Sequence, residues 1–191
     1  MRTFVALNLS PERRAELHAA VEPLREALGR AVSWTREPAL HLTLKFLDDR
    51  SDDFVAQLTE RLTAPLLRLP PIRLEIAGVG AFPSLGRPRV LWVGVAANPD
   101  LSRLYQEVES ACAALGVPRE GRPFHPHVTI GRVRAGVRLD AALLTREAEA
   151  VRFRTVDRAR MADVMESVLG PGGARYRVVS ALVLGGESEE A

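Results

Sequence analysis

The sequence of 191 residues has one cysteine, one lysine and only 5% aromatic residues. The single Cys112 excludes an internal disulfide and a cysteine-rich zinc site. No apolar run approaches the roughly 18–20 residues that a membrane-spanning helix needs. The apolar stretch that follows Arg2 is too short for a signal peptide. These features predict a cytoplasmic protein that does not associate with membranes.

The charges nearly cancel, with 26 basic and 24 acidic residues and a formal net charge of +2. This balance argues against a basic surface that grips nucleic acid over the whole molecule. Every basic residue except Lys45 is arginine, a bias that fits a GC-rich genome and also fits bidentate binding of phosphate. Any steering of an anionic substrate must therefore come from a local arginine patch.

The apolar fraction of 47% and the charged fraction of 26% are typical of a globular protein. The whole chain, residues 1–191, is predicted to form one domain with two lobes, and its acidic end, residues 187–191, is expected to be frayed. Helices are predicted at residues 11–30, 51–65, 99–115 and 139–149. Strands are predicted at residues 3–9, 41–47, 72–78, 90–96, 127–133, 151–156, 159–168 and 174–184.

One short pattern occurs twice, each time at the start of a predicted strand. The two copies are His41-Leu42-Thr43-Leu44 and His127-Val128-Thr129-Ile130. Because side chains alternate along a strand, each histidine shares a face with its threonine and the aliphatic residues enter the core. With four histidines and eight threonines in the chain, two such pairs are about a 1% coincidence. The repeat predicts an α+β fold of two lobes with mainly antiparallel sheets flanked by helices.

The repeated pair suits phosphate chemistry. Two imidazoles on opposite sides of a phosphorus atom can act as general base and general acid without a metal. The Thr43 and Thr129 hydroxyls can donate to phosphate oxygens as negative charge develops.

Further segments accompany the two motifs, and together they resemble the two-histidine phosphoesterase superfamily, in particular the RNA 2′,3′-cyclic phosphodiesterases, also called 2′-5′ RNA ligases. An Asp48-Asp49 pair stands where a glycine is usual in that family. The segments that carry the resemblance are Arg2-Thr3-Phe4-Val5-Ala6-Leu7, Lys45-Phe46-Leu47, Gly80-Ala81-Phe82-Pro83, Arg87-Pro88-Arg89-Val90-Leu91-Trp92, Phe124-His125-Pro126 and Met165-Glu166-Ser167-Val168-Leu169.

The resemblance implies a central cleft with pseudo-twofold symmetry and one motif in each lobe. It further implies hydrolysis of RNA 2′,3′-cyclic phosphate ends to 2′-phosphates, with His41 as proton donor and His127 as proton acceptor. The reverse reaction, with an RNA 5′-hydroxyl in place of water, would be an ATP-independent 2′-5′ ligation. The chain has no G-x-x-x-x-G-K-[ST] motif. No cofactor and no metal are expected, and a monomer is expected.

Two basic residues are secondary candidates for substrate binding. Regular alternation places Lys45 on the face of His41 and Thr43, where it would steer a phosphate or simply extend into solvent. Arg132 matches an arginine that contacts substrate in the family. Strict alternation points it away from His127, but Gly131 permits a kink that would turn it back.

Three other functions stay open at this stage. The first is a phosphodiesterase for a small nucleotide or an ADP-ribose cyclic phosphate, and the second is a non-catalytic module that binds RNA ends. The third is a zinc hydrolase that uses His41, His125 and His127 as ligands. Several aromatic residues are candidates for stacking on a base, and none is singled out: Trp34, Phe46, Phe82, Trp92 and Phe124.

Overall fold

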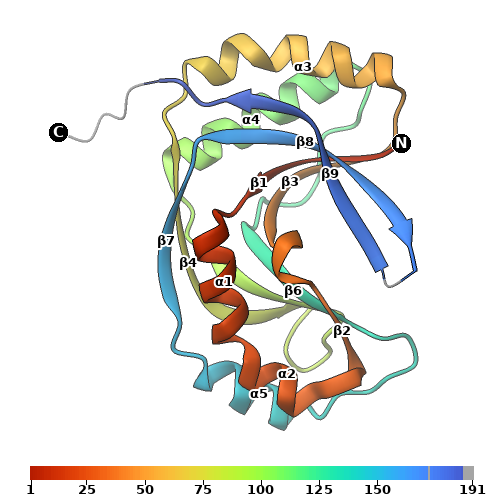
Figure 1. The fold of residues 1–191 in the computed structure, drawn as a ribbon, viewed down its shortest axis with the longest axis vertical. Coiled ribbons are helices and arrows are strands. Elements are labelled where there is room, and N and C mark those ends of the chain that lie inside the picture. Colours follow the sequence, from red (N-terminus) through yellow and green to blue (C-terminus); the bar gives the residue numbers. More distant parts are fainter. Residues whose placement is uncertain (172, 187–191) are drawn as a thin grey trace, which may run out of the picture.

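The computed structural model describes residues 1–171 and 173–186, so the predicted frayed segment lies outside the described residues. It has the predicted α+β class (Figure 1). The helices are α1 (Pro11–Ala20), α2 (Glu22–Leu28), α3 (Asp52–Leu67), α4 (Pro99–Ala114) and α5 (Ala141–Ala150), with 3-10 turns at Gly29–Ala31 and Glu37–Ala39. The strands are β1 (Arg2–Asn8), β2 (Val32–Trp34), β3 (His41–Asp49), β4 (Ile72–Phe82), β5 (Val90–Val95), β6 (His127–Val133), β7 (Arg154–Ala159), β8 (Met161–Gly170) and β9 (Gly173–Val183).

The strands form one antiparallel sheet in the order β7-β4-β5-β6-β3-β1-β8-β9, with β2 attached to β6. One half contains β3, β1, β8 and β9, and the other contains β6, β5, β4 and β7. The halves meet where β3 pairs with β6, and the register there joins Leu42 to Val128. These are the middle residues of the two His-x-Thr triplets, so both motifs lie at the centre of the sheet.

The register of the strands shows a pseudo-twofold relation between the halves. In the first half Thr43 on β3 faces Ala6 on β1, which faces Asp163 on β8. In the second half Thr129 on β6 faces Trp92 on β5, which in turn faces Gly80 on β4. The antiparallel order of β3-β1-β8 therefore corresponds to that of β6-β5-β4.

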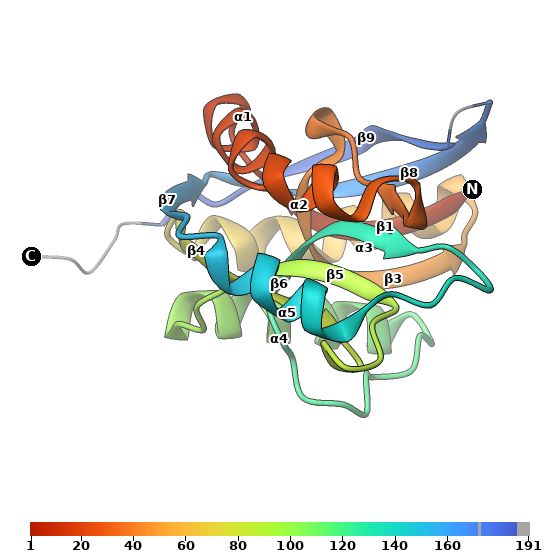
Figure 2. The ribbon, with the colours of Figure 1, turned by 90° about the horizontal axis from the view of Figure 1, so that it is seen from below.

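Helices cover the sheet and close the core. Helices α3 and α4 pack against each other and contact β9, β3 and β4, whereas α5 packs against α2 and β4. Figure 2 shows α2 and α5 beside each other, with α4 on another side of the sheet. The apolar stripe of α3 is buried and follows helical spacing: Val55, Leu58, Leu62 and Leu66. No helix in the described ranges is long and apolar enough to cross a membrane.

Proline explains the main differences in the helices. The predicted helix over residues 11–30 is divided at Val21, because Pro23 lies in the first turn of α2 and lacks the N–H that a continuous helix would use. By contrast, Pro65 does not end α3, which continues to Leu67. Elsewhere β4 is four residues longer than predicted and extends to Phe82, and β2 was missed altogether.

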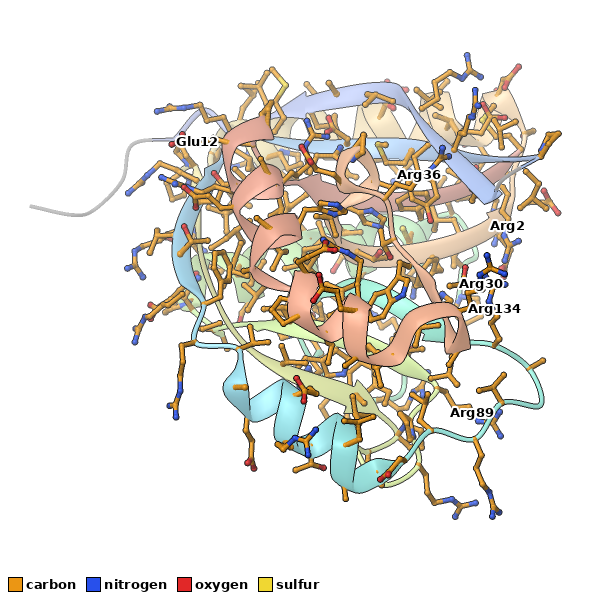
Figure 3. All side chains as sticks on the ribbon, turned by 60° about the horizontal axis from the view of Figure 1, so that its bottom comes forward. Arg2, Glu12, Arg30, Arg36, Arg89 and Arg134 are labelled. Carbon is orange, nitrogen blue, oxygen red and sulfur yellow. The ribbon has the colours of Figure 1, made fainter. Side chains whose placement is uncertain are left out.

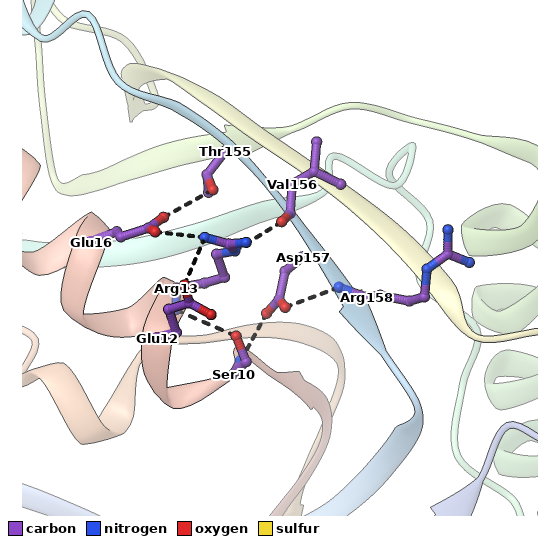
Figure 4. Close-up of polar contacts among 8 residues, drawn as sticks. All are labelled: Ser10, Glu12, Arg13, Glu16, Thr155, Val156, Asp157 and Arg158. Carbon is purple, nitrogen blue, oxygen red and sulfur yellow. Dashed lines mark hydrogen bonds and ion pairs between the residues drawn. The ribbon is translucent and has the colours of Figure 1, made fainter.

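A polar network fastens the start of α1 to β7 (Figure 4). The N–H of Ser10 donates to the buried Asp157 carboxylate at 2.7 Å. Arg13 Nε donates to the carbonyl oxygen of Val156 at 3.0 Å, and the Thr155 hydroxyl donates to Glu16 at 3.0 Å. These contacts tie a helix that follows the first strand to a strand near the end of the chain.

Candidate active site

The two motifs present their polar residues on one face of the sheet, here called the histidine face and defined by His41, Thr43, His127 and Thr129. All four side chains are half-buried, whereas Leu42 and Val128 between them are fully buried on the opposite face. This alternation confirms the pattern predicted for the six residues from sequence.

The two histidines are held in the same way. His41 Nδ1 lies 2.7 Å from the carbonyl oxygen of Ala39, and His127 Nδ1 lies 2.7 Å from that of His125. Because a carbonyl oxygen only accepts, each Nδ1 carries the hydrogen. Each Nε2 is therefore left for chemistry, and that of His41 lies 3.0 Å from Thr43 Oγ1.

Both imidazoles favour the neutral form. Burial lowers the pKa of His41, and the charges of His127 and Arg132 lower it further, against the opposing effect of the Ala39 hydrogen bond. Burial also lowers the pKa of His127, and the charges of His125 and Arg132 add to the effect, although its backbone hydrogen bond opposes them. An anion bound between the two rings would raise both pKa values again, because it favours the charged form.

The predicted position of Lys45 is wrong. Lys45 pairs with Val5 of β1 while Thr43 pairs with Ala6, so Leu44 is an extra residue, a β-bulge that reverses the alternation. Lys45 consequently enters the core, where its Nζ lies 2.8 Å from Glu109 Oε1 and donates to the Pro118 carbonyl oxygen at 2.8 Å.

A matching bulge turns Arg132 toward the histidines. Leu91 pairs with Gly131 and Trp92 with Thr129, so Ile130 is the extra residue in β6. Arg132 is exposed and its charge lowers the pKa of both histidines. Gly131 is buried at this point, where a Cβ would approach Val32 Cγ1 to 2.5 Å.

The same bulges give Phe46 a position equivalent to that of Arg132. Phe46 is 65% exposed, and its ring centroid lies 6.2 Å from that of Phe4. Of the other predicted stacking candidates, Phe124 stacks on Tyr105 at 4.1 Å, and Trp34 packs against the main core.

Aromatic rings surround each histidine. Phe4 and Tyr176 lie 5.0 and 5.2 Å from His41 between ring centroids, and the Tyr176 ring meets His41 edge-on. Phe82 lies 4.9 Å from the His127 ring, and Trp92 lies 6.3 Å from it. These contacts restrict the orientation of the imidazoles.

A polar pair of half-buried Asn8 and buried Asp163 lies in the same half as His41, and sequence reasoning missed it. Asn8 faces His41 across β1 and β3, and its amide donates to the Asp163 carboxylate at 2.7 Å. Burial raises the pKa of Asp163, and the hydrogen bond from Asn8 opposes that effect. Their separation of 155 residues explains why no local sequence signal identified them.

The zinc hypothesis has no ligand set in the described part of the chain, because no three His, Cys, Asp or Glu side chains there gather closely enough to hold a metal. The ring of His125 instead lies among Trp92, Phe82 and His127, at centroid distances of 5.0, 5.2 and 6.2 Å.

Comparisons with known proteins agree with this geometry. The chain is 36% identical over 141 residues to an RNA 2′,3′-cyclic phosphodiesterase of Aeropyrum pernix, covering 73% of this chain and 78% of that protein. It is 31% identical over 177 residues to a protein of the same name from Archaeoglobus fulgidus, covering 93% and 97%.

Solved structures show the same fold over nearly the whole chain. TT0787 of Thermus thermophilus has a TM-score of 0.76 at 29% identity and covers 98% of this chain and 100% of that one. E. coli LigT complexed with 3′-AMP has a TM-score of 0.72 at 26% identity, covering 96% and 97%. The model of the 2′-5′ RNA ligase superfamily matches residues 10–162. With its paired His-x-Thr strands, the chain belongs to the 2′-5′ RNA ligase superfamily.

Proposed function

We propose that this protein is a metal-independent RNA 2′,3′-cyclic phosphodiesterase whose product is a 2′-phosphate. The observation that carries the proposal is the matched pair of histidines, each with Nδ1–H bonded to a backbone carbonyl and Nε2 left for proton transfer. Relatives that share about a third of the sequence bear the name of this activity.

The reaction requires that one proton is removed from the attacking water and that one proton is donated to the leaving oxygen. In the proposal, His127 Nε2 accepts a proton from water as its oxygen attacks phosphorus. His41, protonated at Nε2 when the anionic substrate is bound, donates to the departing 3′ oxygen. The bond between phosphorus and the 3′ oxygen breaks, the bond to the water oxygen forms, and the 2′ oxygen keeps the phosphate.

The threonines and Arg132 stabilise the charge. The Thr43 and Thr129 hydroxyls lie beside the histidines and donate to the nonbridging oxygens as negative charge grows in the transition state. Arg132, whose charge reaches both imidazoles, holds the phosphate by its guanidinium. An RNA 5′-hydroxyl that replaces water would use the same groups in reverse and form a 2′-5′ bond.

The test is ³¹P NMR of a short RNA with a 2′,3′-cyclic phosphate end, incubated with the protein in EDTA. Conversion to a 2′-monophosphate is expected, and His41→Ala and His127→Ala should each abolish it. An unchanged cyclic phosphate would refute the proposal, and turnover that requires added zinc would replace it by the metal mechanism. Binding without turnover in the wild type would point to a module that only holds RNA ends.

A further inference from the structure

An open groove of about 1010 Å³ lies between the loop from β4 to β5 and the loop from β6 to α5. Three arginines, Arg87, Arg89 and Arg138, line it, and none of its described lining residues is acidic. All three side chains are exposed. We call this feature the arginine groove.

Phe82 links the groove to the histidine face. Phe82, whose ring contacts His127 at 4.9 Å, precedes Pro83 at the wall of the groove. Arg89 donates its N–H to the Phe82 carbonyl oxygen at 2.7 Å and accepts from the N–H of Val133 at 2.9 Å. The groove therefore borders the ends of β4 and β6 and the start of β5, next to the residue whose ring contacts His127.

More positive charge lies along this side of the molecule. Arg134 follows Arg132 by two residues, and its Nε donates to the carbonyl oxygen of Arg30 at 2.8 Å. Figure 3 shows Arg30, Arg134 and Arg89 along one side, with Arg2 beyond them. Positive charge thus extends along this side of the molecule as far as Arg89 at the groove.

The groove arginines keep their charge available. Within residues 1–171 and 173–186, no carboxylate pairs with Arg87, Arg89 or Arg138. The acid next to the groove, Asp140, is engaged as the cap of α5 and accepts from the N–H groups of residues 142 and 143. Some arginines outside the groove do pair with carboxylates: Arg13, Arg25, Arg73, Arg103, Arg122, Arg146, Arg154 and Arg177.

We infer that the arginine groove binds the phosphodiester backbone of a single-stranded RNA whose cyclic phosphate end lies between the histidines. The inference rests on the proposed function and adds the place where the strand next to the reacting end is held. A 2′,3′-cyclic phosphate is the 3′ end of its strand, so the remaining nucleotides extend in the 5′ direction. Guanidinium groups bind successive phosphates irrespective of base, which makes this contact independent of sequence.

The experiment compares kcat/KM for 2′,3′-cyclic AMP with that for oligoribonucleotides of two, four and eight residues ending in the same group. In the wild type, kcat/KM is expected to rise with length and to fall steeply with salt. Each phosphate contact contributes a salt slope of about −0.7 on single strands, so Arg87→Ala/Arg89→Ala/Arg138→Ala should lower kcat/KM for the octamer on the order of 50-fold at 0.15 M salt. Its rate on the mononucleotide should not change.

Two controls separate the groove from general effects of charge and folding. Arg61→Ala/Arg68→Ala/Arg160→Ala removes three exposed arginines outside the groove and should leave the length dependence intact. An octamer with neutral methylphosphonate linkages should react with the wild type like the mononucleotide, which tests the phosphates without any mutation.

Equal kcat/KM for all lengths in the wild type would overturn the inference while leaving the phosphodiesterase intact, as would equal losses in the two triple variants. Absence of turnover on every cyclic phosphate, the mononucleotide included, would refute the proposed function itself.

Discussion

Removing the Lys45 ammonium is expected to destabilise the fold rather than to weaken substrate binding. Lys45 and Glu109 are 9% and 3% exposed, with Nζ and Oε1 2.8 Å apart. In Lys45→Met the Glu109 carboxylate keeps the N–H of Glu120 at 3.1 Å but loses its counter-charge inside the core. Leaving one partner of a buried ion pair uncompensated lowers the free energy of unfolding by about 3–5 kcal/mol.

The double variant Lys45→Met/Glu109→Leu tests this reasoning, because it removes both charges together. The double variant still lacks two hydrogen bonds to the loop after α4, one to the carbonyl oxygen of Pro118 and one from the N–H of Glu120. Each contributes about 1 kcal/mol, so the double variant should lose about 2 kcal/mol and be more stable than either single variant.

Urea denaturation measures these free energies, with exposed Arg61→Met on α3 as a control expected to change stability by less than about 0.5 kcal/mol. The loop fixed by Lys45 leads into His127, so Lys45→Met should lower kcat on 2′,3′-cyclic AMP more than it changes KM. If Lys45→Met had wild-type stability and a raised KM, the reasoning would be refuted and Lys45 would instead be a residue that steers the phosphate.

Three further outcomes are expected. The pH profile of kcat/KM should have its maximum below pH 6.5, because burial lowers the pKa of both histidines in the free enzyme. Above that maximum the catalytic acid loses its proton, and below it the catalytic base gains one. A maximum above pH 7 would contradict this reasoning. Gly80→Ala should lower the free energy of unfolding by about 1–3 kcal/mol and alter the fluorescence of Trp92, since a Cβ would lie 2.2 Å from that ring; Gly86→Ala, with space around it, is the control. Thr43→Val and Thr129→Val should each lower kcat by about 10²–10³-fold in single-turnover assays, and a change in KM alone would speak against a role in the transition state.

The sequence predicts the motif residues well because their information is local. Alternation along a strand depends only on neighbours two positions apart, and it correctly places Thr43 and Thr129 beside their histidines. The same alternation places Lys45 on the wrong face, and it places Arg132 correctly only if a kink is added. Both errors arise because a β-bulge depends on how two strands pair. Whether Leu44 or Ile130 is the extra residue depends on the partner strand, which no local pattern reveals.

The pair of Asn8 and Asp163 shows the same limit. These two residues meet only because β1 pairs with β8, and that pairing is a property of the whole fold. The groove was likewise beyond a one-dimensional search, since its three arginines come from two loops about 50 residues apart in the chain. The net charge predicts that a local arginine patch is needed, but it does not predict where on the surface the patch lies.

The order of strands in the sheet has a consequence for how the protein is made. The half that carries His127 has its four main strands in one continuous stretch, residues 72–159, whereas β1 needs β8, with Ala6 facing Asp163 from the far end of the chain. Strands so far apart in the sequence pair late, because a long loop must close, at a cost in entropy, before they can meet. During synthesis the second half can therefore assemble while the first strand still waits for its neighbour. The surroundings of His41 are completed last, after β9 has left the ribosome, so a chain released early carries one histidine in place and the other without its support.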